Sequence, residues 1–135
     1  MNNLFEDEYM KIVSNDIKDC LEVIGKKICD TPADFQRSMQ IINDYVKNTQ
    51  AKKIVFSLQG YNTVGNEEYL SKEFLPVLAI LGVKYIAVIT GDDEKTQSFF
   101  TELSNYTNLV KNEYEIDSEH FKTLEEGLHW IESID

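Results

Sequence analysis

The part of the sequence that comes closest to a reactive site is the loop GYNTVGN. Gly60 and Gly65 have the spacing of a phosphate-binding loop, and the loop joins a predicted strand to a predicted helix N-terminus, where an anion can bind. A nucleotide triphosphatase needs Lys and then Ser or Thr where this chain has Asn66 and Glu67, and Glu68 would repel phosphate. We therefore reject nucleotide triphosphate hydrolysis.

Acidic and histidine side chains offer two other kinds of chemistry. Asp92, Asp93 and Glu94 carry the oxygen ligands that a hard cation binds, but consecutive side chains diverge and no oxygen-rich repeat follows, so we interpret them as a turn and helix cap. His120 and His129 have no spacing that pairs either of them with a Ser, Cys or Thr nucleophile. The sequence thus predicts no catalytic residue, no metal site and no cofactor.

Composition and charge set the class of protein. A chain of 135 residues has the size of one domain, so we predict a single domain over residues 1–135. The net charge of −11 disfavours binding to nucleic acid or anionic membranes, which attract clustered Lys and Arg. Acidic residues concentrate after residue 109; we interpret them as a solvated face, with a docking surface for a basic partner as the alternative.

The termini and cysteines bear on location. The N-terminal segment MNNLFEDEYM has no basic leader and no apolar signal-peptide core, and the uncharged apolar run at residues 74–83 is too short to span a bilayer. Cys20 and Cys29 form neither a disulfide framework nor a metal-site spacing. We expect a cytoplasmic protein with reduced thiols and no membrane insertion.

Any binding residues must be positioned by residues 66–90, the least polar part of the chain. A helix is predicted over residues 66–81, with Asn66 as its N-cap. Pro76 predicts a bend near Lys72. Gly82 suits the left-handed end of the helix, and a buried strand follows at residues 85–90. The expected core face of the helix recurs every three or four residues: Leu70, Phe74, Val77, Leu78 and Leu81.

Before this stretch, the sequence predicts a hairpin. Residues 8–13 and 17–24 have strand patterns, and a polar turn cluster at residues 14–16 separates them. Gly25 ends the second strand. The next strand, at residues 53–58, is expected to run parallel to it.

A helix is predicted between these strands. Asp30 or Thr31 is its cap, Pro32 lies in its first turn, and it ends near residue 48. Four apolar side chains share one face and are expected in the core: Phe35, Met39, Ile42 and Val46.

After residue 90, the sequence predicts two helices and a strand. Residues 91–94 cap a helix that contains Phe99, Phe100 and Leu103. Residues 110–116 alternate as an edge strand with charge on its open side. A capping box, formed by Thr123 and Glu126, opens the last helix. The inner face of that helix comprises Leu124, Leu128, Trp130 and Ile131.

The predicted order of elements is ββαβαβαβα. Strands that alternate with helices after a hairpin indicate an α/β fold. We expect a single mixed, mostly parallel five-stranded sheet with about four helices and right-handed crossovers.

Three segments carry a resemblance to a known family: Gly25, EEYLSKEFLPVLAILGVKYIAVIT at residues 67–90, and FKTLEEGLHWIES at residues 121–133. They resemble the SpoIIAA-like branch of the STAS superfamily (sulfate transporter and anti-sigma-factor antagonist), in particular the small bacterial stand-alone STAS/SEC14-like proteins. The similar positions span nearly the whole chain and are packing residues. The resemblance implies a SpoIIAA-like fold and a non-enzymatic regulatory or interaction module.

The resemblance also implies where a switch would lie. In STAS antagonists, the loop after the central strand carries a phosphorylatable serine in an Asp-Ser-Ser-Gly-like motif, and the added charge alters partner binding. The corresponding loop here, at residues 61–65, has no pair of serines, and Thr63 is its only aliphatic hydroxyl. Thr63 is the candidate phosphosite; an exposed turn residue is the simpler interpretation. Similar proteins often have an acid near Ser57 and a Trp near Tyr69, so the chain departs from them there.

We therefore predict a binding module whose partner is a protein or a small apolar or anionic ligand. A homodimer is compatible with its strand edges and its 11% aromatic residues. Two alternatives remain open: a carrier of a small hydrophobic ligand such as a lipid, which needs a pocket of about 300 Å³, and an uncharacterised hydrolase. The candidate binding surface comprises Gln59, Gly60, Tyr61, Asn62, Thr63, Gly65, Asn66 and Tyr69.

Overall fold

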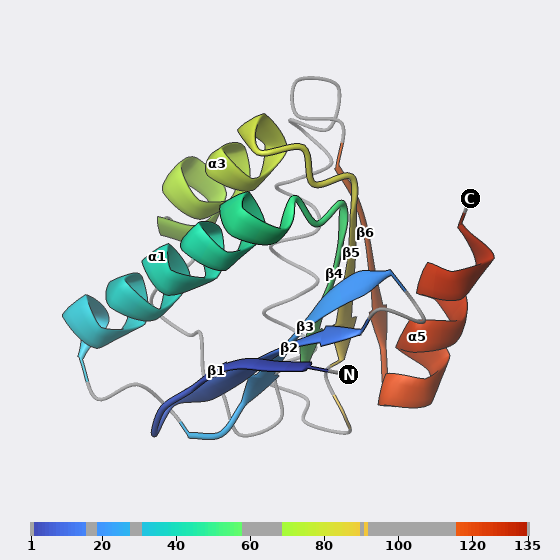
Figure 1. Ribbon diagram of the computed structural model, residues 1–135, viewed down its shortest axis with the longest axis horizontal. Coiled ribbons are helices and arrows are strands. Elements are labelled where there is room, and N and C mark those ends of the chain that lie inside the picture. The colour runs from blue at the N-terminus through green and yellow to red at the C-terminus, as the bar shows by residue number, and fades with distance from the viewer. Residues whose placement is uncertain are drawn as a thin grey trace.

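One mixed sheet forms the centre of the computed structural model, and its strands lie in chain order from β1 to β6 (Figure 1). The structure describes residues 2–15, 19–27, 31–57, 69–89, 91 and 116–134. The β1–β2 and β2–β3 pairs are antiparallel, and the four strands from β3 to β6 run parallel to one another. The strands are β1 (Asn2–Glu6), β2 (Met10–Asn15), β3 (Cys20–Gly25), β4 (Lys53–Ser57), β5 (Tyr85–Ile89) and β6 (Asp117–Phe121).

The α/β class and the mixed sheet are confirmed, but the predicted strand count is wrong. The described residues contain six strands instead of five, and their three α-helices differ from the expected four. Neither β1 nor β6 was predicted, and every side chain of β1 is exposed or only half-buried. Strand β1 forms because its backbone pairs with β2. Since neither of its faces is fully buried, its sequence has no alternation of apolar and polar residues that would predict a strand.

The first turn also explains why the strand predicted at residues 8–13 begins later. The carboxylate oxygen Oδ1 of Asp7 accepts hydrogen bonds from the backbone N–H groups of Tyr9 and Met10, at 2.8 and 2.9 Å. This side chain holds residues 7–9 in a turn, so β2 starts at Met10. The predicted polar turn at Ser14 and Asn15 is wrong as well, because both residues pair with β3.

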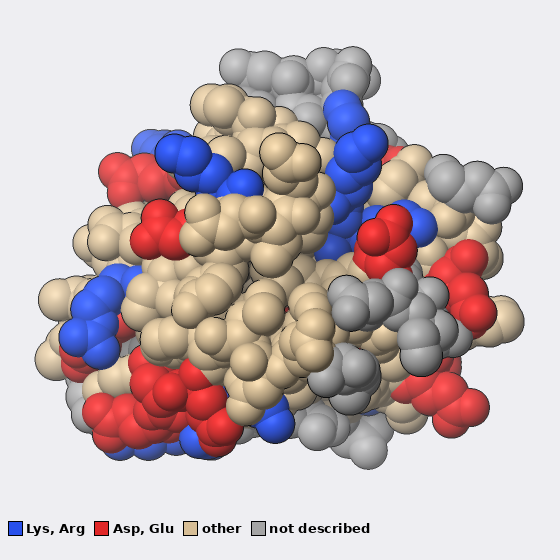
Figure 2. All heavy atoms as spheres, viewed as in Figure 1, with Lys and Arg blue, Asp and Glu red and all other residues tan. Residues whose placement is uncertain are grey.

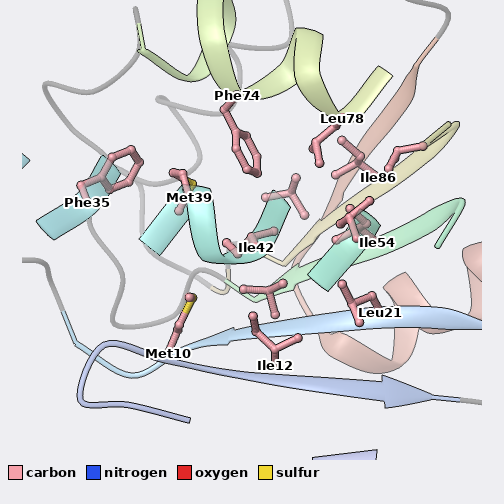
Figure 3. Close-up of a cluster of buried hydrophobic side chains, with 14 of the residues drawn as sticks. Met10, Ile12, Leu21, Phe35, Met39, Ile42, Ile54, Phe74, Leu78 and Ile86 are labelled. Carbon is pink, nitrogen blue, oxygen red and sulfur yellow. The ribbon is translucent and has the colours of Figure 1, made fainter. Parts of the chain in front are cut away.

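One face of the sheet is covered by helix α1 (Pro32–Thr49), the π-helical turn η1 (Leu70–Phe74) and helix α3 (Leu75–Ile80) (Figure 1). Thr31 caps α1 by accepting a hydrogen bond from the backbone N–H of Asp34 at 3.1 Å, which confirms the predicted start. The four predicted core residues of α1 are all buried. In Figure 3, Phe74 and Leu78 point from η1 and α3 toward Ile42, Ile54 and Ile86.

The bend expected from Pro76 takes the form of η1. A π turn closes its hydrogen bonds over a longer span than an α turn, and here it lies directly before the proline, which occupies the first turn of α3. The prediction for Gly82 is confirmed, since its φ is +100°. Its N–H donates to Ala79 O and that of Val83 donates to Leu78 O, a Schellman ending.

The other face of the sheet is covered by α5 (Leu124–Ser133). Its predicted capping box is confirmed, because the backbone N–H of Glu126 donates to Oγ1 of Thr123 at 3.2 Å and that hydroxyl lies 3.0 Å from the Glu126 carboxylate. Gly127 and Ile131 form its buried side. The expectation that Leu124 lies inside is wrong, since 38% of this residue is exposed. The buried cluster on this face comprises Cys20, Val55, Ala87, Ile89 and Ile131.

The last described strand, β6, was not predicted. Of the edge strand expected at residues 110–116, only Ile116 is described, and the observed strand β6 follows it. Strand β6 has the sequence DSEHF, whose residues are half-buried or exposed, and it is placed by parallel pairing with β5. The helix predicted around Phe99, Phe100 and Leu103 lies outside the described residues. No described helix is long and apolar enough to cross a membrane.

Candidate functional site

Of the predicted binding surface, the structure describes Tyr69. The surface residues outside the described part of the chain are Gln59, Gly60, Tyr61, Asn62, Thr63, Gly65 and Asn66. The acidic turn at residues 92–94 and Cys29 also lie outside it. The described part of the candidate site therefore begins at Tyr69 and continues along η1 and α3.

Tyr69 connects the start of this segment to α1. Its ring lies edge-on to the ring of Phe35, with centroids 6.3 Å apart and an interplanar angle of 79°. Its side chain hydrogen-bonds with Gln40. Burial raises the pKa of the Tyr69 phenol above its usual value, and the nearby Glu73 carboxylate acts in the same direction. Tyr69 thus serves as a packing residue of the scaffold as well as a member of the predicted surface.

Helix α3 presents apolar side chains to solvent. Ile80 is 83% exposed and Val77 is 38% exposed, and together with Leu124 they are the exposed large hydrophobic residues of the described chain. The opposite side of the helix is anchored in the core by Leu78, which is fully buried. No charged residue lies between Glu73 and Lys84. The helix therefore carries an uncharged outer face on a fixed support.

The sequence placed Val77 in the core, and the structure shows that this was wrong. The prediction assumed one α-helical period from residue 66 to residue 81. The wider turn of η1 advances each residue through a smaller angle, so the residues after it are rotated relative to the face calculated from α-helical spacing. Pro76 was the only signal in the sequence that the period was interrupted.

Lysines gather beside the C-terminal end of α3. The backbone carbonyl of Lys52 accepts hydrogen bonds from the N–H groups of Lys84 and Tyr85, at 2.8 and 3.1 Å, so the chain before β4 and the chain after α3 lie side by side. Lys47, in the last turn of α1, is exposed, as are Lys52 and Lys84. In Figure 2, a band of Lys and Arg side chains lies between an uncharged surface and a group of Asp and Glu side chains.

This group, Lys47, Lys52 and Lys84, is called the lysine corner below. The chain between Asp44 and Glu67 contains three lysines and no acid, and the chain between Glu73 and Asp92 contains Lys84 and no acid. These two segments meet at the lysine corner, and the start of β6 adjoins it, since the backbone N–H of Asp117 donates to the carbonyl of Lys84 at 2.9 Å. In a protein with a net charge of −11, three exposed lysines and one neighbouring acid, Asp117, therefore belong to this corner, and Ile80, the most exposed apolar residue of the described chain, precedes Lys84 by four residues.

A buried polar pair on the α5 side of the sheet was missed at the sequence level. The Nδ2 group of Asn15 donates to Oε2 of Glu22 at 2.8 Å, and only 6% and 4% of these residues are exposed. The pair joins β2 to β3, inside the sheet. The sequence signal that could have predicted the burial of Glu22 was its position in an interior strand, where both faces of the sheet are usually covered.

The remaining reactive residue types do not form a cluster in the described chain. His120 and His129 are exposed, and Cys20 is buried in the apolar cluster under α5. Among the described residues, no group of three or more His, Cys, Asp or Glu side chains could hold a metal ion. Lys53 has a structural contact, since its Nζ donates to the carbonyl of Ile134 at 2.8 Å at the end of α5.

Comparison with known proteins identifies no relative. No protein-family model, curated protein or solved structure matches the chain. The resemblance to the STAS superfamily therefore stays a prediction that depends on the segments quoted above.

Proposed function

We propose that this protein is a non-enzymatic binding module that acts by protein–protein contact through the connection between β4 and β5. The observation that carries the proposal is the exposure of Ile80 and Val77 on a helix whose opposite side is buried in the core. Contiguous exposed apolar side chains are typical of interaction sites, and Val77 and Ile80, three residues apart on α3, are neighbours on the helix surface.

The scaffold favours this use of α3. Phe74 and Leu78 anchor the segment in the core, Tyr69 packs on α1, and the Schellman ending at Gly82 fixes the exit of the chain. A surface that is already ordered loses little conformational entropy when a partner binds. The predicted surface residues, from Gln59 to Asn66, lead into the same segment and are included in the proposal.

The resemblance to the STAS superfamily supports the same class of function. Members that act as antagonists work by contact with a partner, and no catalytic signature was found in this sequence. In this proposal, Thr63 remains the candidate for regulation by phosphorylation.

An affinity-capture experiment tests the proposal. Immobilised wild-type protein and the variants Ile80→Asp and Leu124→Asp are each exposed to a lysate of the source cells. We expect a partner that wild type and Leu124→Asp retain and Ile80→Asp loses, because Leu124 is an exposed apolar residue on a different helix.

Three results would contradict the proposed function. Capture that is unaffected by Ile80→Asp would contradict the use of α3. Lipid that co-purifies with the protein in native mass spectrometry would favour a hydrophobic carrier instead. Turnover of an ester, phosphate or nucleotide by the pure protein would favour a hydrolase.

A further inference from the structure

We infer that the partner of α3 is an acidic protein segment with an apolar anchor, which places the anchor on Ile80 and its carboxylates on the lysine corner. This inference rests on the proposed function, because it names the chemistry of the partner at the same helix. Its observational basis is the position of Ile80, the most exposed apolar residue of the described chain, four residues before Lys84 and at a corner where exposed lysines outnumber the neighbouring acid, Asp117.

The backbone fixes the relation between the two parts of this site. Ile80 ends α3, and the Schellman turn at Gly82 leads to Lys84 within four residues. The hydrogen bond from Lys84 N–H to the Lys52 carbonyl then brings the segment before β4 alongside. Lys47 lies in the last turn of α1, and the chain then leads from the end of α1 to Lys52. The apolar and basic parts therefore belong to one corner of the molecule.

The net charge of −11 does not prevent an acidic partner from binding here. At physiological ionic strength, charges are screened over about 8 Å, so the carboxylates on remote surfaces contribute little at this corner. The local charges decide which sign of partner is attracted: Lys47 and Lys52 are exposed, and Asp117, whose backbone N–H donates to the Lys84 carbonyl, is an acid beside the third lysine. Complementary charge at the rim of an apolar contact mainly increases the association rate and the specificity.

A protein segment fits this site better than a nucleic acid or a membrane. Polyanions are held by many phosphate contacts spread along a basic surface, and the affinity grows with the number of those contacts. The lysine corner offers few cations, and the acidic remainder of the molecule would repel an extended polyanion. Exposed Ile80 and Val77 instead suit the apolar side of an amphipathic segment.

The test uses defined peptides as probes. One fluorescent amphipathic peptide carries leucines on one face and glutamates on the other, and its twin has lysines in place of the glutamates. We expect wild-type protein to bind the glutamate peptide, to ignore the lysine twin, and to bind more weakly as sodium chloride is raised. Fluorescence polarisation measures each dissociation constant.

Matched variants locate the contact. Lys47→Glu combined with Lys52→Glu is expected to weaken glutamate-peptide binding by at least about tenfold, a change of about 1.4 kcal/mol. Ile80→Ser is expected to weaken it by a similar factor. Lys122→Glu, a charge reversal at an exposed residue before α5, and Leu124→Ser should leave it unchanged. Circular dichroism checks that every variant is folded.

Several results would overturn the inference. They are no binding of the glutamate peptide, equal binding of both twins, or insensitivity to the lysine variants. Displacement of the peptide by an oligonucleotide or by phosphatidylserine vesicles would assign the corner to those ligands. If the protein self-associates and Ile80→Ser abolishes this, the outer face of α3 binds a second copy of the protein instead. If Ile80→Asp abolishes capture of a cellular partner but lysine reversal has no effect, the proposed function stands and this inference fails.

Discussion

Single side chains in this protein show how a polar residue is kept inside an apolar sheet. Glu22 is buried in β3, and Asn15 on the neighbouring strand donates a hydrogen bond to its carboxylate. The intact pair contributes little net stability, because both groups lose their water when they are buried. Removal of the donor is costly, because the buried carboxylate then has no hydrogen bond to replace that water. The pair therefore fixes how β2 and β3 align.

Removal of Asn15 tests this interpretation. We expect Asn15→Ala to lower the free energy of unfolding by about 2 kcal/mol, since Glu22 then loses a donor in a buried site. Asn15→Ala combined with Glu22→Leu should recover most of that loss, because no buried charge remains. Urea denaturation of both variants measures the change. A double variant as unstable as Asn15→Ala would contradict the role given to Glu22.

Tyr69 gives a prediction about how the stability of the protein depends on pH. Burial raises the pKa of its phenol in the folded state, so folding favours the protonated form. Stability is unaffected below the usual tyrosine pKa and is expected to fall as the pH rises above it. Tyr69→Phe keeps the ring against Phe35 and should remove this part of the alkaline loss. NMR of tyrosine labelled at the Cζ carbon measures the titration; a Tyr69 that ionises no later than exposed tyrosines would contradict it.

Secondary-structure elements differ in how well their sequence predicts them. Helix α1 was predicted because Thr31, Pro32 and its apolar face are local signals that agree with one another. The helix around Pro76 was predicted as one element and is two, because the sequence does not reveal the π turn that absorbs the proline. Strands β1 and β6 are placed by backbone pairing, which leaves little pattern in their side chains.

The close approach of α5 to β5 is a property of the packed elements. A Cβ atom on Gly127 would lie 2.5 Å from Cδ1 of Ile89. The atom that must move is the end of a side chain, but Ile89 is only 1% exposed and has little room to turn. We therefore expect Gly127→Ala to destabilise the protein by about 1 kcal/mol through overpacking, although alanine favours a helix by about 1 kcal/mol over glycine.

A double-variant cycle separates these two effects. Ile89→Val removes Cδ1, so Gly127→Ala in that background should be neutral or stabilising. Thermal denaturation of the four proteins gives the coupling energy. Equal effects of Gly127→Ala in both backgrounds would show that α5 does not pack on Ile89 as described.

The whole molecule shows why the fold was more predictable than the site. Core residues such as Phe35, Ile42 and Leu78 repeat with the period of their helices, and the repeat identifies them. The lysine corner has no such pattern, since Lys52 and Lys84 are far apart in the sequence and are brought together where β4 and β5 begin to pair. The exposure of Val77 depends on the rotation that η1 introduces.

The central claim is that this protein works by contact through the outer face of α3. The most direct measurement is the dissociation constant of the captured partner for wild type, Ile80→Ser and Leu124→Ser, by isothermal titration calorimetry. The account predicts a loss of at least about tenfold for Ile80→Ser and no change for Leu124→Ser, with all three proteins equally stable. An unchanged dissociation constant for Ile80→Ser, or a loss confined to Leu124→Ser, would contradict it.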